Sequence, residues 1–195
     1  LVCSIVCVYF TAIIFISSLL INNNVMNIFG LNSLAQFLFY LFRTLAIMML
    51  LFVLYIDISF LTGNFTQENV RFFINIHFLG TLIKGDYQFN VILTISLTLI
   101  FFVAFFFVLS NIFKALKEDV IFNHQAIKNL HYFTLLNLGV GPALYLLVHY
   151  VIMQKENYRD IHNLILLIIF GIVALFLTNI FKKGARVQNE NDLTI

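Results

Sequence analysis

Residues 91–113 read VILTISLTLIFFVAFFFVLSNIF, an apolar run that contains no charged side chain. A helix needs about 20 such residues to cross the roughly 30 Å hydrocarbon core of a bilayer. Because no water reaches the backbone at that depth, a crossing segment of this kind must satisfy its own hydrogen bonds as a helix. The run therefore predicts a transmembrane helix and a membrane-embedded fold.

Further apolar runs of comparable length surround this segment, over residues 1–21, 34–61, 131–153 and 161–181. Across the chain 62% of the residues are hydrophobic and 10% are charged, so there are too few polar side chains to cover a water-soluble globule. We predict an all-α integral membrane protein, in which residues 34–195 form one domain, a four-helix transmembrane bundle. Residues 1–33 add an extra N-terminal apolar helix and a linker.

The N-terminal apolar run leaves two hypotheses open. Residues 1–21 begin with Leu, lack the basic start of a secretory signal, and are followed by an uncharged linker. Met26 precedes a chain that is self-sufficient as a four-helix protein without residues 1–25. Either Met26 is the true start and residues 1–25 are a mis-assigned leader, or residues 1–21 form a genuine fifth helix. An intact mass of the natively expressed protein distinguishes the two.

Basic residues beside the apolar runs predict how the bundle is oriented. Three Lys lie in residues 114–130 and three Lys or Arg in the tail, residues 182–195, whereas the 62–90 and 154–160 loops hold two each. Lys and Arg are enriched in short cytoplasmic loops. We therefore expect the inner loop 114–130 and the tail in the cytoplasm, with the outer loop 62–90 on the other side. Arg43, near the start of its helix, is expected to extend to the same cytoplasmic interface.

The tail opens with residues that are typical of a helix end. Lys182 and Lys183 complement the negative end of a helix dipole, and Gly184 can adopt the left-handed conformation that terminates a helix. We expect the last helix to stop at Gly184. In the inner loop, Asn123 is expected to cap the next helix, whose apolar repeat begins at Ile127.

The inner loop and the tail lie on the same face of the predicted bundle, within reach of each other. Val187, Leu193 and Ile195 of the tail would find apolar partners in Phe122 and Ile127. In one interpretation the tail folds back over the inner loop; in the other it is a short ligand presented to a cytosolic protein. The candidate residues for either role are Phe122, Ile127, Gly184, Val187, Gln188, Glu190, Asn191, Asp192, Leu193, Thr194 and Ile195.

Residues outside the inner loop and the tail indicate features of the fold and no catalytic or metal site. The outer loop 62–90 carries too many bulky apolar side chains for a solvated linker, so we expect it to fold back on the bundle or lie in the headgroup layer. Pro142 removes one helical hydrogen bond, and we expect a kink near Leu138 that serves helix packing. His149 has no neighbours at metal-ligand spacing and is expected to be a single interfacial histidine.

The tail and the inner loop also resemble a known family. The ending IFKKGARVQNENDLTI, residues 180–195, is similar to the terminal signature of domain of unknown function 2975, a group of small bacterial membrane proteins. The segment IFKALKEDVIFNHQAIKNLHYF, residues 112–133, is similar to the family's loop between its second and third helices, with Asp119 and Ile121 where Gly and Pro are usual. The resemblance covers about residues 34–195. It implies four transmembrane helices in the bacterial cytoplasmic membrane, with both termini cytoplasmic.

The predicted function follows from the classes that the sequence disfavours. The chain has no GxSxG, HExxH or phosphate-loop motif, so we predict no enzyme activity, no cofactor and no metal site. Its Lys and Arg are dispersed and its net charge is +2, which argues against direct nucleic-acid binding. A non-catalytic membrane anchor or sensor that acts by contacts fits the polar segments best. The alternative is a small permease or channel-like transport component, for which the helices offer only scattered Ser, Thr, Asn and Tyr.

The predicted partners are the lipid bilayer and a cytosolic protein. Family members are often encoded beside a small helix-turn-helix regulator, so the resemblance implies such a regulator as the cytosolic partner. The sequence indicates no particular substrate or signal, and it leaves a homo-oligomer open.

Overall fold

The computed structural model describes residues 28–30, 33–76, 80–118, 120–154 and 161–192. Within these residues the fold consists of four long helical rods: α2 (Leu34–Thr62), α3 (Phe89–Leu116), a continuous rod from His124 to Ile152, and α6 (Ile161–Asp192). Each rod is long and apolar enough to cross a membrane, so the predicted four-helix membrane fold is confirmed. The predicted helix over residues 1–21 lies outside the described residues.

The third rod contains two π-helical turns, labelled η. Its consecutive segments are α4 (His124–Leu135), η1 (Leu136–Val140), α5 (Gly141–Leu146) and η2 (Leu147–Ile152). Pro142 explains the first of these turns, because its ring carries no backbone donor and would clash with the Leu138 carbonyl in a regular α-helix. In η1 the Gly141 N–H donates to the Leu136 carbonyl instead. The disturbance expected near Leu138 is therefore a widened π-helical turn.

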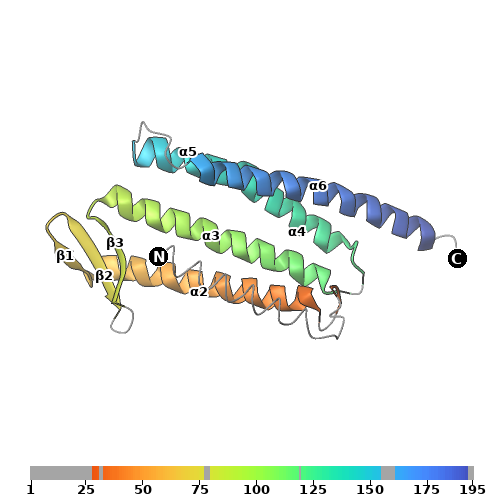
Figure 1. Ribbon diagram of the computed structural model, residues 1–195, viewed down its shortest axis with the longest axis horizontal. Coiled ribbons are helices and arrows are strands. Elements are labelled where there is room, and N and C mark those ends of the chain that lie inside the picture. Colours follow the sequence, from red (N-terminus) through yellow and green to blue (C-terminus); the bar gives the residue numbers. More distant parts are fainter. Residues whose placement is uncertain (1–27, 31–32, 77–79, 119, 155–160, 193–195) are drawn as a thin grey trace.

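Successive rods run in opposite directions, so the bundle has two distinct ends (Figure 1). We call the end that carries the three β-strands the sheet end, and the opposite end, where α6 terminates, the tail end. α2 packs along α3, and α4 packs against both α3 and α6. A core of buried side chains joins α3, α4 and α6 in the tail-end half of the bundle: Ile112, Leu130, Phe133 and Ala174.

Large apolar side chains also cover the outside of the rods. Leu51 on α2 and Phe176 on α6 are 60% and 67% exposed. Many other leucines, isoleucines and phenylalanines are also exposed. Together they form apolar patches far larger than those on a monomer in water. The same surface is compatible with lipid, so the composition and the packing agree on a membrane protein.

Local hydrogen bonds fix where the helices begin and end. Asn123 caps α4 as predicted, because its side-chain oxygen accepts a hydrogen bond from the Ala126 N–H at 2.6 Å. The Asn123 amide also donates to the Ala115 carbonyl at 3.0 Å, which ties the start of α4 to the end of α3. At the other end of the bundle α2 stops at Gly63, whose φ of 71° is a left-handed conformation that glycine adopts without strain.

The predicted outer loop forms an antiparallel three-stranded sheet of β1 (Thr66–Glu68), β2 (Arg71–Ile76) and β3 (Gly80–Asp86). Phe72 and Ile74, on one face of β2, are fully buried against Ile56 of α2. Arg71, on the opposite face, is exposed and pairs with Asp86 at 3.8 Å. The expectation that this segment folds back on the bundle is confirmed, and the sheet is an element that the all-α prediction lacks.

Candidate functional site at the tail end

The last helix continues well past the residue at which the sequence predicted its end. α6 runs through Gly184 to Asp192, and Gly184 is not among the described glycines with a positive φ. The prediction of a left-handed helix end at Gly184 is therefore wrong. The residues that follow it, Ala185 to Asn189, extend the backbone ladder of a helix that the membrane segment has already nucleated, so no capping glycine is required.

Gly184 instead provides room for an aromatic side chain of the inner loop. A Cβ atom built at this position would lie 2.6 Å from Cδ1 of Phe122, and two further atoms of the same ring lie within 2.8 Å. The Phe122 ring also makes an edge contact with the ring of Phe181, with centroids 5.2 Å apart. The inner loop therefore packs against α6 at Phe181 and Gly184, one helical turn apart.

The other candidate residues that the structure describes lie along the same helix or beside it. Ile127 and Gln188 are half-buried, whereas Val187 is 56% exposed and Glu190 is exposed. Asn191 and Asp192 form the last described residues of α6. Leu193, Thr194 and Ile195 lie outside the described residues, so the contacts expected of Leu193 and Ile195 are not among those that the structure describes.

The length of α6 carries its C-terminal part beyond the bundle. Its 32 residues span about 48 Å at 1.5 Å per residue, a few Å more than the 28-residue α3 and the 29-residue α2. We call residues 182–192 the α6 extension. Figure 1 shows α6 reaching past the start of α4 at the tail end. The extension begins with Lys182, Lys183 and Arg186, all exposed.

Cations at the tail end lie over aromatic rings. The Lys117 ammonium is 5.1 Å from the centroid of Phe39, and the Lys128 ammonium is 5.8 Å from that of Tyr132. The Arg43 guanidinium lies 4.1 Å from the centroid of Phe107 on α3, and its Nη1 atom is buried. Its extension to the cytoplasmic interface stays a prediction. Each pair places positive charge on the negative face of a ring, which stabilises a cation at reduced solvation.

The model of a protein family, described as protein of unknown function (DUF2975), matches residues 64–195. The chain belongs to this family. The DUF2975 match contains the sheet, α3, the third rod and the whole α6 extension, and it begins after α2, so it is shorter than the coverage that the resemblance implied. Comparisons with curated proteins and with solved structures found no significant match. Membership assigns no activity to its residues.

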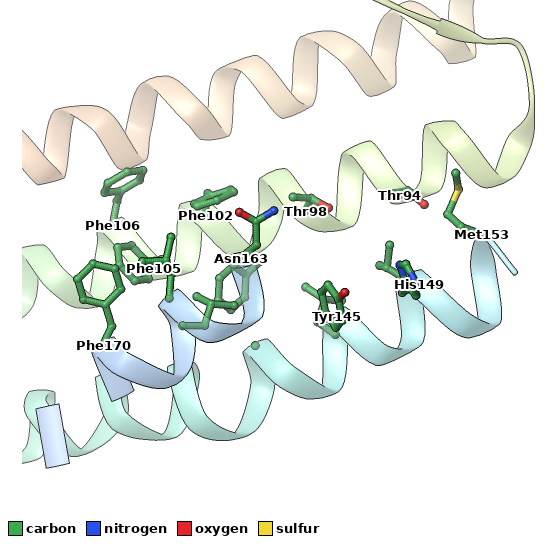
Figure 2. Close-up of a pocket in the computed structure, with 16 residues that line it drawn as sticks. Thr94, Thr98, Phe102, Phe105, Phe106, Tyr145, His149, Met153, Asn163 and Phe170 are labelled. Carbon is green, nitrogen blue, oxygen red and sulfur yellow. The ribbon is translucent and has the colours of Figure 1, made fainter. Parts of the chain in front are cut away.

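A cavity in the sheet-end half of this DUF2975 protein is a feature that the sequence analysis missed. Its volume is about 530 Å³, and it lies between α3 on one side and α5, η2 and the start of α6 on the other (Figure 2). Thr94 and Thr98 line it from α3, and Tyr145 and His149 from the facing rod. Both pairs are spaced four residues apart, which places each pair on one helix face, and that spacing is readable in the sequence.

His149, expected to be a single interfacial histidine, packs against a neighbouring aromatic ring. Its side chain is 6% exposed, and its ring stacks on that of Tyr145 with centroids 5.4 Å apart. It is therefore buried inside the bundle. Across the described part of the chain no group of three or more His, Cys, Asp or Glu is placed to hold a metal ion.

Proposed function

We propose that this membrane protein acts by contacts, as an anchor or sensor that holds a cytosolic partner on the α6 extension. The observation that carries the proposal is the continuity of α6: a transmembrane helix that leaves the bundle as one rod and displays exposed side chains beyond it. In isolation, the short segment of residues 182–192 would form only a marginal helix in water. Continuous with a membrane-spanning segment and held at Gly184 by Phe122, it is a preformed binding element.

Charge supports the cytoplasmic position of the extension. Lys182, Lys183 and Arg186 come first, where they would meet the anionic headgroups of a cytoplasmic leaflet. Glu190 and Asp192 come last, farthest from the bundle. An acidic helix tip complements a basic protein surface. A DNA-binding regulator of the helix-turn-helix class has such a surface, and we propose this class as the partner, in the bacterial cytoplasmic membrane.

The proposal predicts that a photocrosslinker at Val187 captures a cytosolic protein in the native host, identified by mass spectrometry. Val187 is 56% exposed on the extension. Ile172, 45% exposed on the apolar part of the same helix, is the matched control and should capture lipid but no soluble protein. Reversing both acidic charges, with Glu190→Lys and Asp192→Lys, should reduce the capture by about tenfold or more, as expected for loss of complementary charge at an interface.

Two results would contradict the proposed function. One is a crosslink from Val187 that joins only residues of the same chain, because the extension would then be a structural contact. The other is capture that the charge reversal leaves unchanged. Expression of the variants at the level of the parent chain, measured in isolated membranes, excludes a loss caused by degradation.

A small permease or channel-like component is the second candidate, and the cavity of about 530 Å³ is the observation that favours it. The middle of the bundle argues for the contact role, because the deep part of the cavity is lined by Phe101, Phe105 and Phe170 rather than by polar groups. A conducting path requires polar groups along its length. Solute flux in reconstituted vesicles would support the transport role over the contact role.

A further inference from the structure

The sheet-end cavity has a polar part and an apolar part. Thr94 lies close to the start of α3 at Phe89, and Met153 lies just beyond the end of η2, so this part is close to the sheet end of the bundle. Farther along α3 the lining changes to Phe102 and Phe106. Figure 2 shows the order along α3, from Thr94 through Thr98 and Phe102 to Phe106. An occupant of this cavity would meet the hydroxyl groups and the His149 imidazole at one end and mainly aromatic rings at the other, with the Asn163 amide of α6 beside Phe102 (Figure 2).

Two hydroxyl groups in the polar part lack hydrogen-bond partners. Thr94 Oγ1 and the Tyr145 hydroxyl are both buried, and neither has a partner among the residues that the structure describes. They come from opposite walls, α3 and the third rod. Removing such a group from water without a partner costs free energy, most of all within a membrane. A molecule in the cavity that accepts hydrogen bonds from both would remove this cost.

The Thr94 hydroxyl differs from other helical hydroxyls of this chain. Thr134 and Thr178 donate to the carbonyl groups of Leu130 and Ala174 within their own helices, at 2.9 and 2.7 Å. This is the usual way in which a buried threonine in a membrane helix is satisfied. Thr94 makes no such bond in the described structure, so its buried donor lacks the partner that Thr134 and Thr178 have.

The rest of the lining defines the chemical class of the occupant. The described lining contains the His149 imidazole but no Lys, Arg, Asp or Glu, so a charged ligand would find no permanently charged partner there. Phenylalanine rings on α3 and α6 supply flat apolar walls. The volume of about 530 Å³ lies within the range of roughly 300–1,000 Å³ that is typical of small-molecule pockets.

We infer that the cavity binds an uncharged lipophile whose ring or head carries carbonyl oxygens, as a quinone does. Thr94 and Tyr145 donate hydrogen bonds to the carbonyl oxygens, and the aromatic walls hold the apolar body toward the middle of the bundle. This inference goes beyond the proposed partner contact and does not rest on it, because the cavity and the α6 extension lie at opposite ends of the molecule.

Equilibrium binding of radiolabelled decylubiquinone to the full chain in nanodiscs tests this inference, with empty nanodiscs subtracted to remove partitioning into lipid. We expect saturable binding to the parent protein. The double variant Thr94→Val and Tyr145→Phe keeps the shape of both side chains and removes both donors. It should bind about tenfold more weakly or worse, because two hydrogen bonds of ordinary strength are lost.

A matched control is available on the outer surface of α2. Thr44 and Tyr40 are exposed, and the Thr44 hydroxyl already donates to backbone carbonyl groups of its own helix. The double variant Thr44→Val and Tyr40→Phe should bind the probe as the parent does. Because the cavity hydroxyls are buried without partners in the described structure, their removal relieves a cost and should not lower the unfolding temperature of the protein, which shows that the variant is folded.

Competing molecules identify the source of the carbonyl groups. Unlabelled decylubiquinone should displace the probe, and decylbenzene, which has no carbonyl group, should not. Displacement by dioctanoylglycerol at a concentration similar to that of the quinone would support the carbonyl site and assign it to an ester lipid. Equal displacement by decylbenzene, unchanged binding to the Thr94 and Tyr145 double variant, or absence of saturable binding would overturn the inference.

Discussion

Gly184 is the residue at which local sequence pattern and three-dimensional packing give different answers. A glycine after two lysines at the end of an apolar run is typical of a helix end. In the fold the same glycine lies inside α6 and accommodates the ring of Phe122. A residue without a Cβ can either end a helix or leave room for a neighbouring ring. Only the position of Phe122, some sixty residues earlier in the chain, shows which of the two applies here. Asn123 was predictable because its cap depends on neighbours only three residues away.

The substitution Gly184→Ala tests this account of the glycine. The new methyl group would lie 2.6 Å from the Phe122 ring, so we expect a loss of about 1–3 kcal/mol in the free energy of unfolding, as is usual for overpacking. Denaturation of the purified protein in mixed detergent micelles measures it. Gly139→Ala is the control, since its nearest contact would be an ordinary 3.5 Å to Leu135.

A second substitution tests whether the stability loss of Gly184→Ala comes from a steric conflict with Phe122 or from a change in the helix itself. Phe122→Leu should restore much of the stability of Gly184→Ala, because a smaller side chain vacates the space beside the new methyl group. A Gly184→Ala protein as stable as Gly139→Ala would rule out the close packing of the inner loop on α6.

Among the elements, the three-stranded sheet has a strand pattern in the sequence that the all-α prediction did not use. The outer loop was correctly expected to fold onto the bundle from the number of its bulky side chains. Phe72 and Ile74 alternate with Arg71 and Phe73, a period of two that is typical of a strand with one buried face. Asn69 adopts a positive φ of 56° between the paired residues Glu68 and Arg71, as in a tight hairpin.

Phe72 is the largest fully buried side chain that holds the sheet to the bundle. Phe72 has no exposed surface and makes an edge contact with Phe60 of α2, with ring centroids 4.9 Å apart. Phe72→Ala should destabilise the sheet by about 3–5 kcal/mol, the usual cost of emptying a buried phenylalanine site. Limited proteolysis in detergent should then cleave residues 66–86 faster while the rods stay intact, because the sheet opens locally.

Phe73→Ala is the matched control for this prediction. Phe73 is the next residue on the same strand, points to the other face and is only half-buried. Its loss should change the cleavage rate much less. Equal protease sensitivity of the two variants would mean that the sheet is not held to the bundle through the Phe72 face.

At the scale of the whole molecule, apolar run length predicted the four rods because the bilayer restricts a crossing chain to helices. The bounds of α2 agree with the predicted run, while α3, the third rod and α6 extend beyond theirs. The cavity was not predictable from run length, since it depends on how α3 faces the third rod. The two ends of the bundle are chemically different, with the sheet at one and exposed cations of α6 at the other.

Cysteine accessibility measures most directly whether the α6 extension lies in the cytoplasm, across the membrane from the sheet. In a background with Cys3 and Cys7 replaced by Ser, the variants Gln67→Cys on β1 and Asn189→Cys on the extension each place one thiol at an exposed position. A membrane-impermeant maleimide should label the Gln67→Cys protein in intact cells and the Asn189→Cys protein only after lysis. Labelling of the Asn189→Cys protein in intact cells would place the extension outside and contradict its role as a cytosolic binding element.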